Sequence, residues 1–173
     1  MPTMQAARTK DFDSDQGHLA RNHLGSVTIL LKTGAYMFHR VMIPIDLAHT
    51  EKLTKAITLA GELAQQHGAE IVYVGVTASA PSAIAHSEQE FAEKLDAFAE
   101  GQKKTFKVPV ATRTINCHDP AVELHPALID ASQTIGADVI VMASHVPGMR
   151  EHFLSSNAGY VASHAPISVF VVR

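Results

Sequence analysis

The stretch Arg40–Asp46, RVMIPID, is a short apolar run rich in branched side chains that ends in a Pro-x-Asp sequence. Such a composition is typical of a β-strand that is buried on both faces, and strands of this kind occur mainly in parallel sheets. Directly after it, apolar residues recur at helical spacing from Leu53 to Ala64, and Gly68 stands where a helix end is expected. The stretch therefore predicts the first strand–helix unit of an α/β fold.

The alternation of strand and helix continues to the end of the sequence. Helix-length segments separate four further apolar runs, which are EIVYVGV ending at Val76, VPVATRTI over Val108–Ile115, ADVIVMA ending at Ala143, and the final ISVFVVR. Pro109 suggests an edge position for the run that contains it. One helix has two candidate starts, at Asp119-Pro120 or at His125-Pro126. The pattern predicts a single doubly wound, five-stranded parallel sheet with helices on both faces, a Rossmann-like α/β fold.

The composition narrows the class of protein. The chain has 173 residues, of which 46% are hydrophobic and 18% charged, so a sizeable core in one domain is expected. The formal net charge is −3, and the sequence has no basic block interleaved with aromatic residues, so we do not expect nucleic acid as a partner. Cys117 is the single cysteine, which excludes an intrachain disulfide and suits a reducing cytoplasm. No run reaches the roughly 18–20 apolar residues of a membrane span, so we expect a cytoplasmic protein.

The first 37 residues differ from the rest of the chain. Residues 1–25 are polar and show no pattern that would form a core face, and Lys32 interrupts the more apolar segment that follows. A signal peptide or membrane anchor is not indicated by this arrangement. We therefore expect residues 1–37 to form a disordered N-terminal extension and residues 38–173 to form the folded domain.

Several enzyme motifs are absent from the sequence. It contains no GxGxxG after the first strand, no GxxxxGK[ST] and no GxSxG. The 11 histidines show none of the spacings typical of metal sites. Cys117, His118 and Asp119 are adjacent on a strand, so their side chains do not converge. With no activated nucleophile, carboxylate pair or metal cluster in the pattern, we expect ATP hydrolysis to be slow or incidental at most.

Candidate ligand-binding residues stand at the predicted carboxyl ends of strands, where open parallel sheets bind ligands. Asp46 ends the first strand and could accept hydrogen bonds from ribose hydroxyls, or it could cap the next helix or bind loop amides. Ser155, Ser156 and Asn157 open a predicted helix, where they could be ordinary caps or part of a phosphate site. The residues alone leave both pairs of alternatives open.

The chain resembles the universal stress protein family from about Phe38 to Arg173. Three segments carry the resemblance in the right order and spacing, and they are RVMIPIDLAH, GADVIVMASH and FLSSNAGYVASHAPISVFVVR. The resemblance implies the strand order 3-2-1-4-5 and a cytoplasmic homodimer with a role in the stress response. One branch of the family binds ATP or AMP, with Mg²⁺ expected alongside ATP, and another branch does not bind nucleotide.

The resemblance also implies which residues would contact a nucleotide. Asp46, beside Pro44 and Ile45, matches the family's ribose-binding aspartate, and Val76 matches the valine at the adenine. The family's phosphate loop reads G-x2-G-x9-G-[ST], and the loop here is one residue shorter with its glycines replaced. The positions implied for phosphate contact are Met142, Ala143, His145, Val146, Ser155, Ser156 and Asn157. Because a Cβ at Ser155 disfavours positive φ, weak nucleotide binding is expected.

The final strand, ISVFVVR, predicts how the chain associates. It is apolar almost throughout, and an exposed apolar edge strand invites aggregation unless it is paired. Pairing with a second copy would bury Val169, Phe170 and Val171 symmetrically, which agrees with the homodimer that the resemblance implies. The alternative to a nucleotide-binding regulator is a stress protein that binds no nucleotide and acts through such protein–protein contacts.

Overall fold

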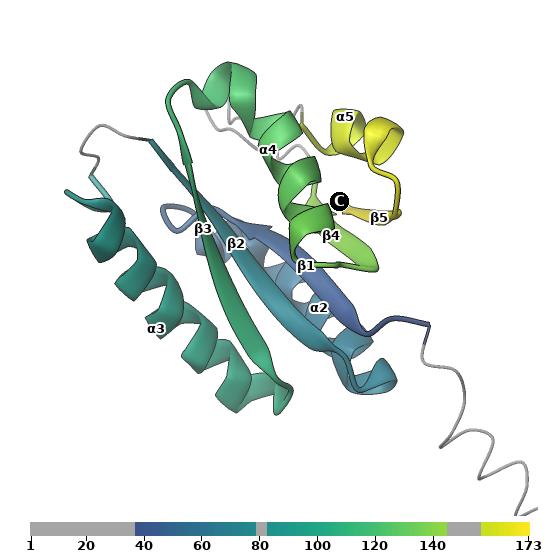
Figure 1. The fold of residues 1–173 in the computed structure, drawn as a ribbon. Coiled ribbons are helices and arrows are strands. Elements are labelled where there is room, and N and C mark those ends of the chain that lie inside the picture. The colour runs from purple at the N-terminus through teal and green to yellow at the C-terminus, as the bar shows by residue number, and fades with distance from the viewer. Residues whose placement is uncertain (1–36, 79–82, 145–156) are drawn as a thin grey trace, which may run out of the picture. The chain divides into compact units, whose positions relative to one another are not determined.

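The computed structural model describes residues 37–78, 83–144 and 157–173. They form five strands and the helices that connect them (Figure 1). The strands are β1 (Arg40–Ile45), β2 (Glu70–Ala78), β3 (Val110–Cys117), β4 (Val139–Ala143) and β5 (Ser168–Val172). The helices are the short 3-10 helix η1 (Thr50–Leu53) followed by α2 (Thr54–His67), α3 (Glu88–Phe106), α4 (Pro120–Thr134) and α5 (Asn157–His164). The predicted N-terminal extension lies outside the described residues, except for Met37.

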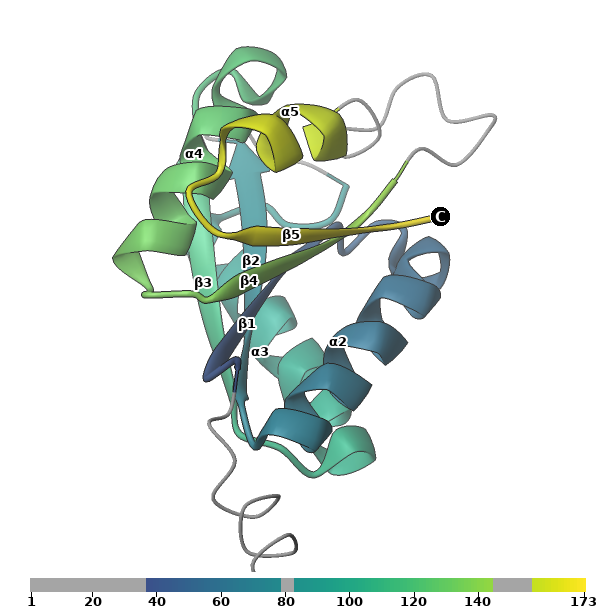
Figure 2. The ribbon, with the colours of Figure 1, turned by 90° about the vertical axis from the view of Figure 1, so that its right-hand side faces the viewer.

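The sheet is parallel throughout, in the order β3-β2-β1-β4-β5, which confirms the predicted fold and strand order. Helices α2 and α3 cover one face of the sheet, and α4 and α5 cover the other (Figure 2). The central strand β1 is therefore enclosed by β2 and β4 at its sides and by helices on both faces. None of the helices in the described part of the chain is long and apolar enough to cross a membrane.

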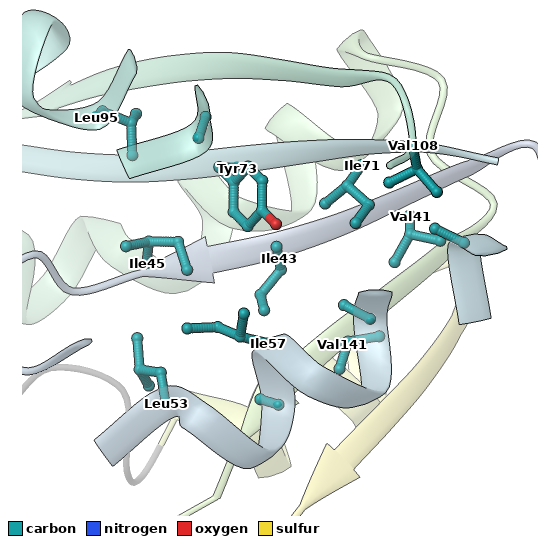
Figure 3. Packing of buried hydrophobic residues seen from close by; sticks show 14 of the residues in the cluster. Val41, Ile43, Ile45, Leu53, Ile57, Ile71, Tyr73, Leu95, Val108 and Val141 are labelled. Atoms are coloured by element: carbon teal, nitrogen blue, oxygen red, sulfur yellow. The ribbon is translucent and has the colours of Figure 1, made fainter. Parts of the chain in front are cut away.

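Alternate residues of the strands build two separate cores. Val41, Ile43 and Ile45 of β1 pack toward the α2 and α3 side, together with Tyr73 of β2 (Figure 3). Met42 packs in the other core, under α4 and α5. Because the side chains of a strand alternate between the two faces, a strand buried on both must be apolar at every position. This requirement accounts for the uninterrupted apolar run with which β1 is encoded.

Prolines mark two of the element starts. Strand β3 begins at Val110 rather than Val108, because Pro109 has no amide to donate, although its carbonyl oxygen accepts a hydrogen bond from the Ile71 amide at 2.9 Å. The edge position predicted from Pro109 is confirmed. Helix α4 begins at Pro120, the earlier of the two candidate starts, and continues through Pro126.

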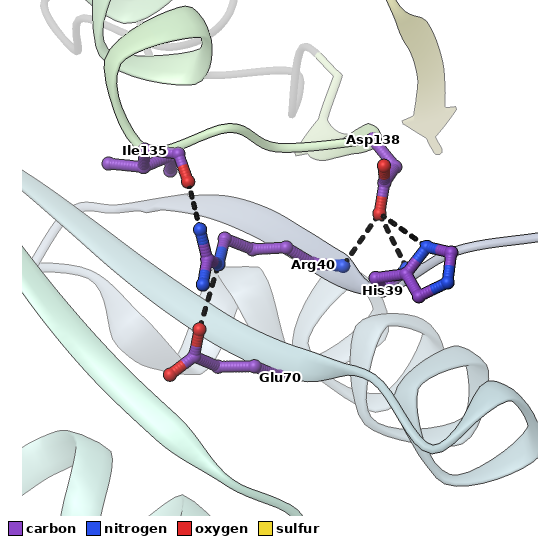
Figure 4. Close-up of polar contacts among 5 residues, drawn as sticks. All are labelled: His39, Arg40, Glu70, Ile135 and Asp138. Atoms are coloured by element: carbon purple, nitrogen blue, oxygen red, sulfur yellow. Dashed lines mark hydrogen bonds and ion pairs between the residues drawn. The ribbon is translucent and has the colours of Figure 1, made fainter.

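A polar cluster fixes the amino end of β1 (Figure 4). The carboxylate of Asp138 accepts hydrogen bonds from the backbone amides of His39 and Arg40, the latter at 2.8 Å. The Arg40 guanidinium binds Glu70 at 2.8 Å and also donates to the carbonyl oxygen of Ile135. These contacts join the starts of β1, β2 and β4. They therefore fix the register of the central strands at their amino ends.

The hydroxyl of Tyr73 is buried in the first core and has no hydrogen-bond partner among the residues that the structure describes. Burial raises the pKa of this hydroxyl above its ordinary value. Tyr73→Phe removes the unpaired group and keeps the ring that packs edge-on against Phe98. We expect a free energy of unfolding that is unchanged or raised by about 1 kcal/mol, measured by urea denaturation. Tyr160→Phe, at an exposed tyrosine on α5, is the control and should change nothing. A clear loss of stability in Tyr73→Phe alone would contradict this account.

Candidate functional site

Strands β1 and β4 separate before β1 reaches its carboxyl end. Their paired residues are Val41 with Val139 and Met42 with Ile140, whereas β1 stays paired with β2 up to Ile45. Strand β4 continues beside β5, and past its end the Ser144 amide donates to the Val172 carbonyl oxygen at 2.6 Å. The winding direction of the sheet reverses between β1 and β4, which is where α/β sheets bind ligands.

Pro44 provides a physical reason for this separation. The carbonyl oxygen of Arg40 accepts a hydrogen bond from the amide of Asp138, so even-numbered residues of β1 face β4 with their backbone groups. Pro44 is even-numbered and carries no N–H, which removes a ladder hydrogen bond to β4 at this point. The pairing of β1 with β4 therefore ends at Met42, four residues before Asp46.

A pocket of about 250 Å³ lies at the carboxyl ends of β1 and β2. Its wall is mostly apolar, and the starts of α3 and α4 close its sides through Phe91 and Leu124. Polar side chains enter it from the β1 end and the β2 end. The described lining residues are Pro44, Ile45, Asp46, Leu47, Ala48, His49, Val74, Val76, Thr77, Ala78, Ile84, Phe91, Pro120 and Leu124. An apolar wall with a few convergent polar groups is the usual composition of a small-molecule site.

Asp46 is the acidic group in the described lining. Its Oδ1 accepts a hydrogen bond from the Ala48 amide at 2.9 Å, and its Oδ2 lies 2.9 Å from Nδ1 of His49. The amide contact is one of the alternatives that the sequence left open for Asp46. A carboxylate has about four lone-pair sites, so these two contacts leave acceptor capacity for a ligand. The side chain is 26% exposed, which leaves it accessible from the pocket.

The helix starts that flank the pocket are fixed by their own caps. Ser87 Oγ accepts from the Glu90 amide at 3.1 Å, and the Glu90 carboxylate accepts from the His86 amide, one residue before the cap, at 2.8 Å, which together form a variant of the capping box for α3. Phe91 follows at once and is held against the pocket. At α4, the Glu123 carboxylate accepts from the His118 amide at 2.9 Å in a similar way.

The structure brings some of the sequence-predicted residues together. Pro44, Ile45, Asp46 and Val76 all line the pocket. Strand β2 runs two residues beyond Val76, so Val76 lies inside the strand rather than at its end. These four positions form a continuous part of the pocket wall.

The residues predicted for phosphate contact are distributed differently. Met142 is buried in the core under α4 and α5, and Ala143 packs at the edge of the other core; neither belongs to the described lining of the pocket. Asn157 is the first residue of α5. His145, Val146, Ser155 and Ser156 lie outside the described residues.

Several lining residues were not identified from the sequence as site residues. Phe91 and Leu124 each fall on an apolar stripe at helical spacing in the sequence, and such a stripe does not distinguish a core residue at a helix start from a pocket wall. Thr77 and His49 follow the predicted strand ends and carry no motif of their own. The place of Thr77 near the carboxyl end of β2 and of His49 just beyond the end of β1 is the one signal that could have indicated them.

Cys117 does not take part in a reactive site. Its side chain is buried, and burial, followed by the nearby Glu123 carboxylate, raises the pKa of its thiol. Thiolate chemistry needs the opposite shift. Within residues 37–78, 83–144 and 157–173, no group of three or more His, Cys, Asp or Glu side chains is placed to hold a metal ion. What the described lining offers a ligand is an apolar wall and the carboxylate of Asp46 as an acceptor.

Comparison with known proteins gives the following similarities. Residues 37–173 match the model of the universal stress protein family. Universal stress protein G of Salmonella typhimurium is 30% identical over 142 residues, which cover 79% of this chain and 100% of that protein.

Solved structures share the fold. The universal stress protein of Archaeoglobus fulgidus in complex with dAMP has a TM-score of 0.57 at 14% identity, covering 79% of this chain and 99% of that one. A universal stress protein family protein of Arabidopsis thaliana with AMP bound has a TM-score of 0.51 at 12% identity, covering 78% and 90% respectively.

Gly75 of β2 controls how close Phe91 comes to the strand. A Cβ at Gly75 would lie 2.5 Å from Cε1 of Phe91 and 3.0 Å from Cδ2 of Leu95, so the Phe91 ring must move. Gly75→Ala should lower the free energy of unfolding by about 1–3 kcal/mol through overpacking. Gly101→Ala is the matched control: it meets no atom within 4 Å and lies inside α3, so it should raise stability by about 0.5–1 kcal/mol. Urea denaturation measures both, and shifts of the same sign would contradict the prediction.

Proposed function

The chain belongs to the universal stress protein family, and from that premise we propose that it binds an adenine nucleotide in the pocket at Asp46. The ligand is AMP, or ATP with Mg²⁺. The observation that carries the proposal is a carboxylate with spare acceptor capacity at the rim of an apolar pocket, where the strand order reverses. The apolar wall suits the faces of an adenine ring, and the carboxylate suits the ribose hydroxyls.

Two further observations support this choice of ligand. Val76 and Thr77 both line the pocket at the carboxyl end of β2, so its wall offers an apolar side chain and a hydroxyl. The Archaeoglobus fulgidus and Arabidopsis thaliana proteins with this fold are described in complex with dAMP and AMP. An adenine nucleotide is therefore the ligand class that agrees with both the wall chemistry and the relatives.

We propose micromolar or weaker affinity because the family's phosphate-loop glycines are replaced in this sequence. Ser155 and Val146 carry Cβ atoms, and each costs on the order of 1 kcal/mol if its position requires positive φ. A loss of about 1.4 kcal/mol is a tenfold loss of affinity. Ser156 and the backbone amides before α5 would remain as phosphate donors.

The proposed physiological role is that of a cytoplasmic, homodimeric stress-response regulator. Strand β5 is an edge of the sheet and exposes Phe170 and Val171, each 41% accessible. Pairing with the same strand of a second copy would cover these side chains. The same exposed strand favours the second candidate function, a stress protein that acts through protein contacts without binding nucleotide.

Removing the Asp46 carboxylate tests the nucleotide proposal. Asp46→Ala should abolish the heat of binding seen with ATP and Mg²⁺ or with AMP in titration calorimetry, because the ribose loses its acceptor. Asp130→Ala, at an exposed aspartate of α4, is the control and should bind as the wild type does. Ser156→Ala should weaken binding, and Ser155→Gly should tighten it. If millimolar nucleotide gives no heat with either the wild type or Ser155→Gly, the protein-contact function is favoured instead.

A charge on the exposed edge strand tests the dimer. Val171→Lys should convert a dimer at micromolar concentration to a monomer in light scattering, because pairing would bring two ammonium groups into an apolar interface. Val122→Lys provides a matched control, since Val122 is 69% exposed on α4. A wild-type protein that is monomeric at this concentration, or a Val171→Lys variant that remains dimeric, would contradict the assignment.

A further inference from the structure

The side chain of His49 occupies one oxygen of the carboxylate that the proposed function assigns to the ligand. Its Nδ1 lies 2.9 Å from Oδ2 of Asp46, and the two side chains are 23% and 26% exposed. His49 lines the same pocket. Because a carboxylate accepts hydrogen bonds, the imidazole nitrogen is the donor in this contact. The protein itself therefore holds a position from which a sugar hydroxyl would donate to Oδ2.

We infer that His49 competes with the ligand for Oδ2 of Asp46, so that a nucleoside uses only the remaining acceptor capacity of the carboxylate until the imidazole leaves. The inference rests on the proposed function and adds to it a residue that sets the affinity of the site. The two hydrogen bonds to Asp46 differ in how easily they can be broken. Oδ1 accepts from the backbone amide of Ala48, which the loop fixes, whereas the imidazole belongs to a side chain that can change rotamer.

The contact between His49 and Asp46 is one that a ligand must displace. The pocket joins β1, β2, α3 and α4, and among its described lining residues Asp46 and His49 are the acidic and basic groups that face one another. A hydrogen bond to an ionised carboxylate is roughly twice as strong as one between neutral groups, so breaking it costs binding free energy. Removing the imidazole therefore strengthens ligand binding.

Titration calorimetry with adenosine tests the competition. Adenosine is the probe because it carries no phosphate, so only its base and sugar hydroxyls can contact the protein. His49→Ala should bind adenosine about two- to tenfold more tightly than the wild type. His49→Asn keeps an N–H donor at this position, so it should bind as weakly as the wild type does.

A second histidine–aspartate pair supplies the matched control. His39 Nδ1 lies 3.6 Å from Asp138 at the opposite end of β1, so His39→Ala should keep the wild-type affinity. If His49→Ala binds no more tightly than the wild type, while Asp46→Ala abolishes binding, the competition is overturned and the proposed function stands. If adenosine binds neither the wild type nor any variant, both are overturned. Should His49→Ala fail to fold, His49→Leu, which also lacks an N–H donor, decides: it too should bind more tightly than the wild type, and unchanged affinity would overturn the competition.

Discussion

The missing amide of Pro44 is the constraint on which the arrangement of the site depends. Strand β1 is the central strand of the sheet, and it would otherwise be free to pair with β4 along its whole length. The backbone alternation that turns Arg40 toward β4 also turns Pro44 toward it, and proline cannot donate there. Pairing with β4 stops at Met42, while pairing with β2 continues to Ile45. The carboxyl end of β1 is thus paired with β2 but not with β4, and Asp46, which follows it, lines the pocket.

The rest of the fold holds that end of the strand in place without filling the space beside it. The Asp138 and Glu70 contacts fix the amino ends of the central strands. Two apolar cores clamp β1 from both faces, and Gly75 lets Phe91 approach β2 at the pocket wall. The capping box at Ser87 and Glu90 sets where α3 begins and therefore where Phe91 stands. A rigid sheet end with apolar side walls is what a ring-shaped ligand needs.

The sequence predicted the fold well because the residue types of a strand depend directly on which of its faces are buried. A strand enclosed on both faces must be apolar at every position, and RVMIPID and ADVIVMA show that pattern without ambiguity. The strand order came from the family resemblance rather than from the pattern. Of the site, Asp46 was predicted from its place at a strand end, whereas Pro44, Ile45 and Val76 came from the family resemblance. Phe91, Leu124 and the His49–Asp46 contact were not predicted, since each depends on how distant elements meet or on a rotamer in a turn.

Amide chemical-shift mapping by ¹⁵N NMR during titration with AMP tests the central claim most directly. The account predicts that the largest shifts fall on the amides of Ile45–His49 at the end of β1 and on Val76–Ala78 at the end of β2. The amides of His39 and Asp138, at the opposite edge of the sheet, should not move and serve as an internal control. Shifts confined to other surfaces, or no shifts at millimolar AMP, would contradict the claim that the pocket at Asp46 is the nucleotide site.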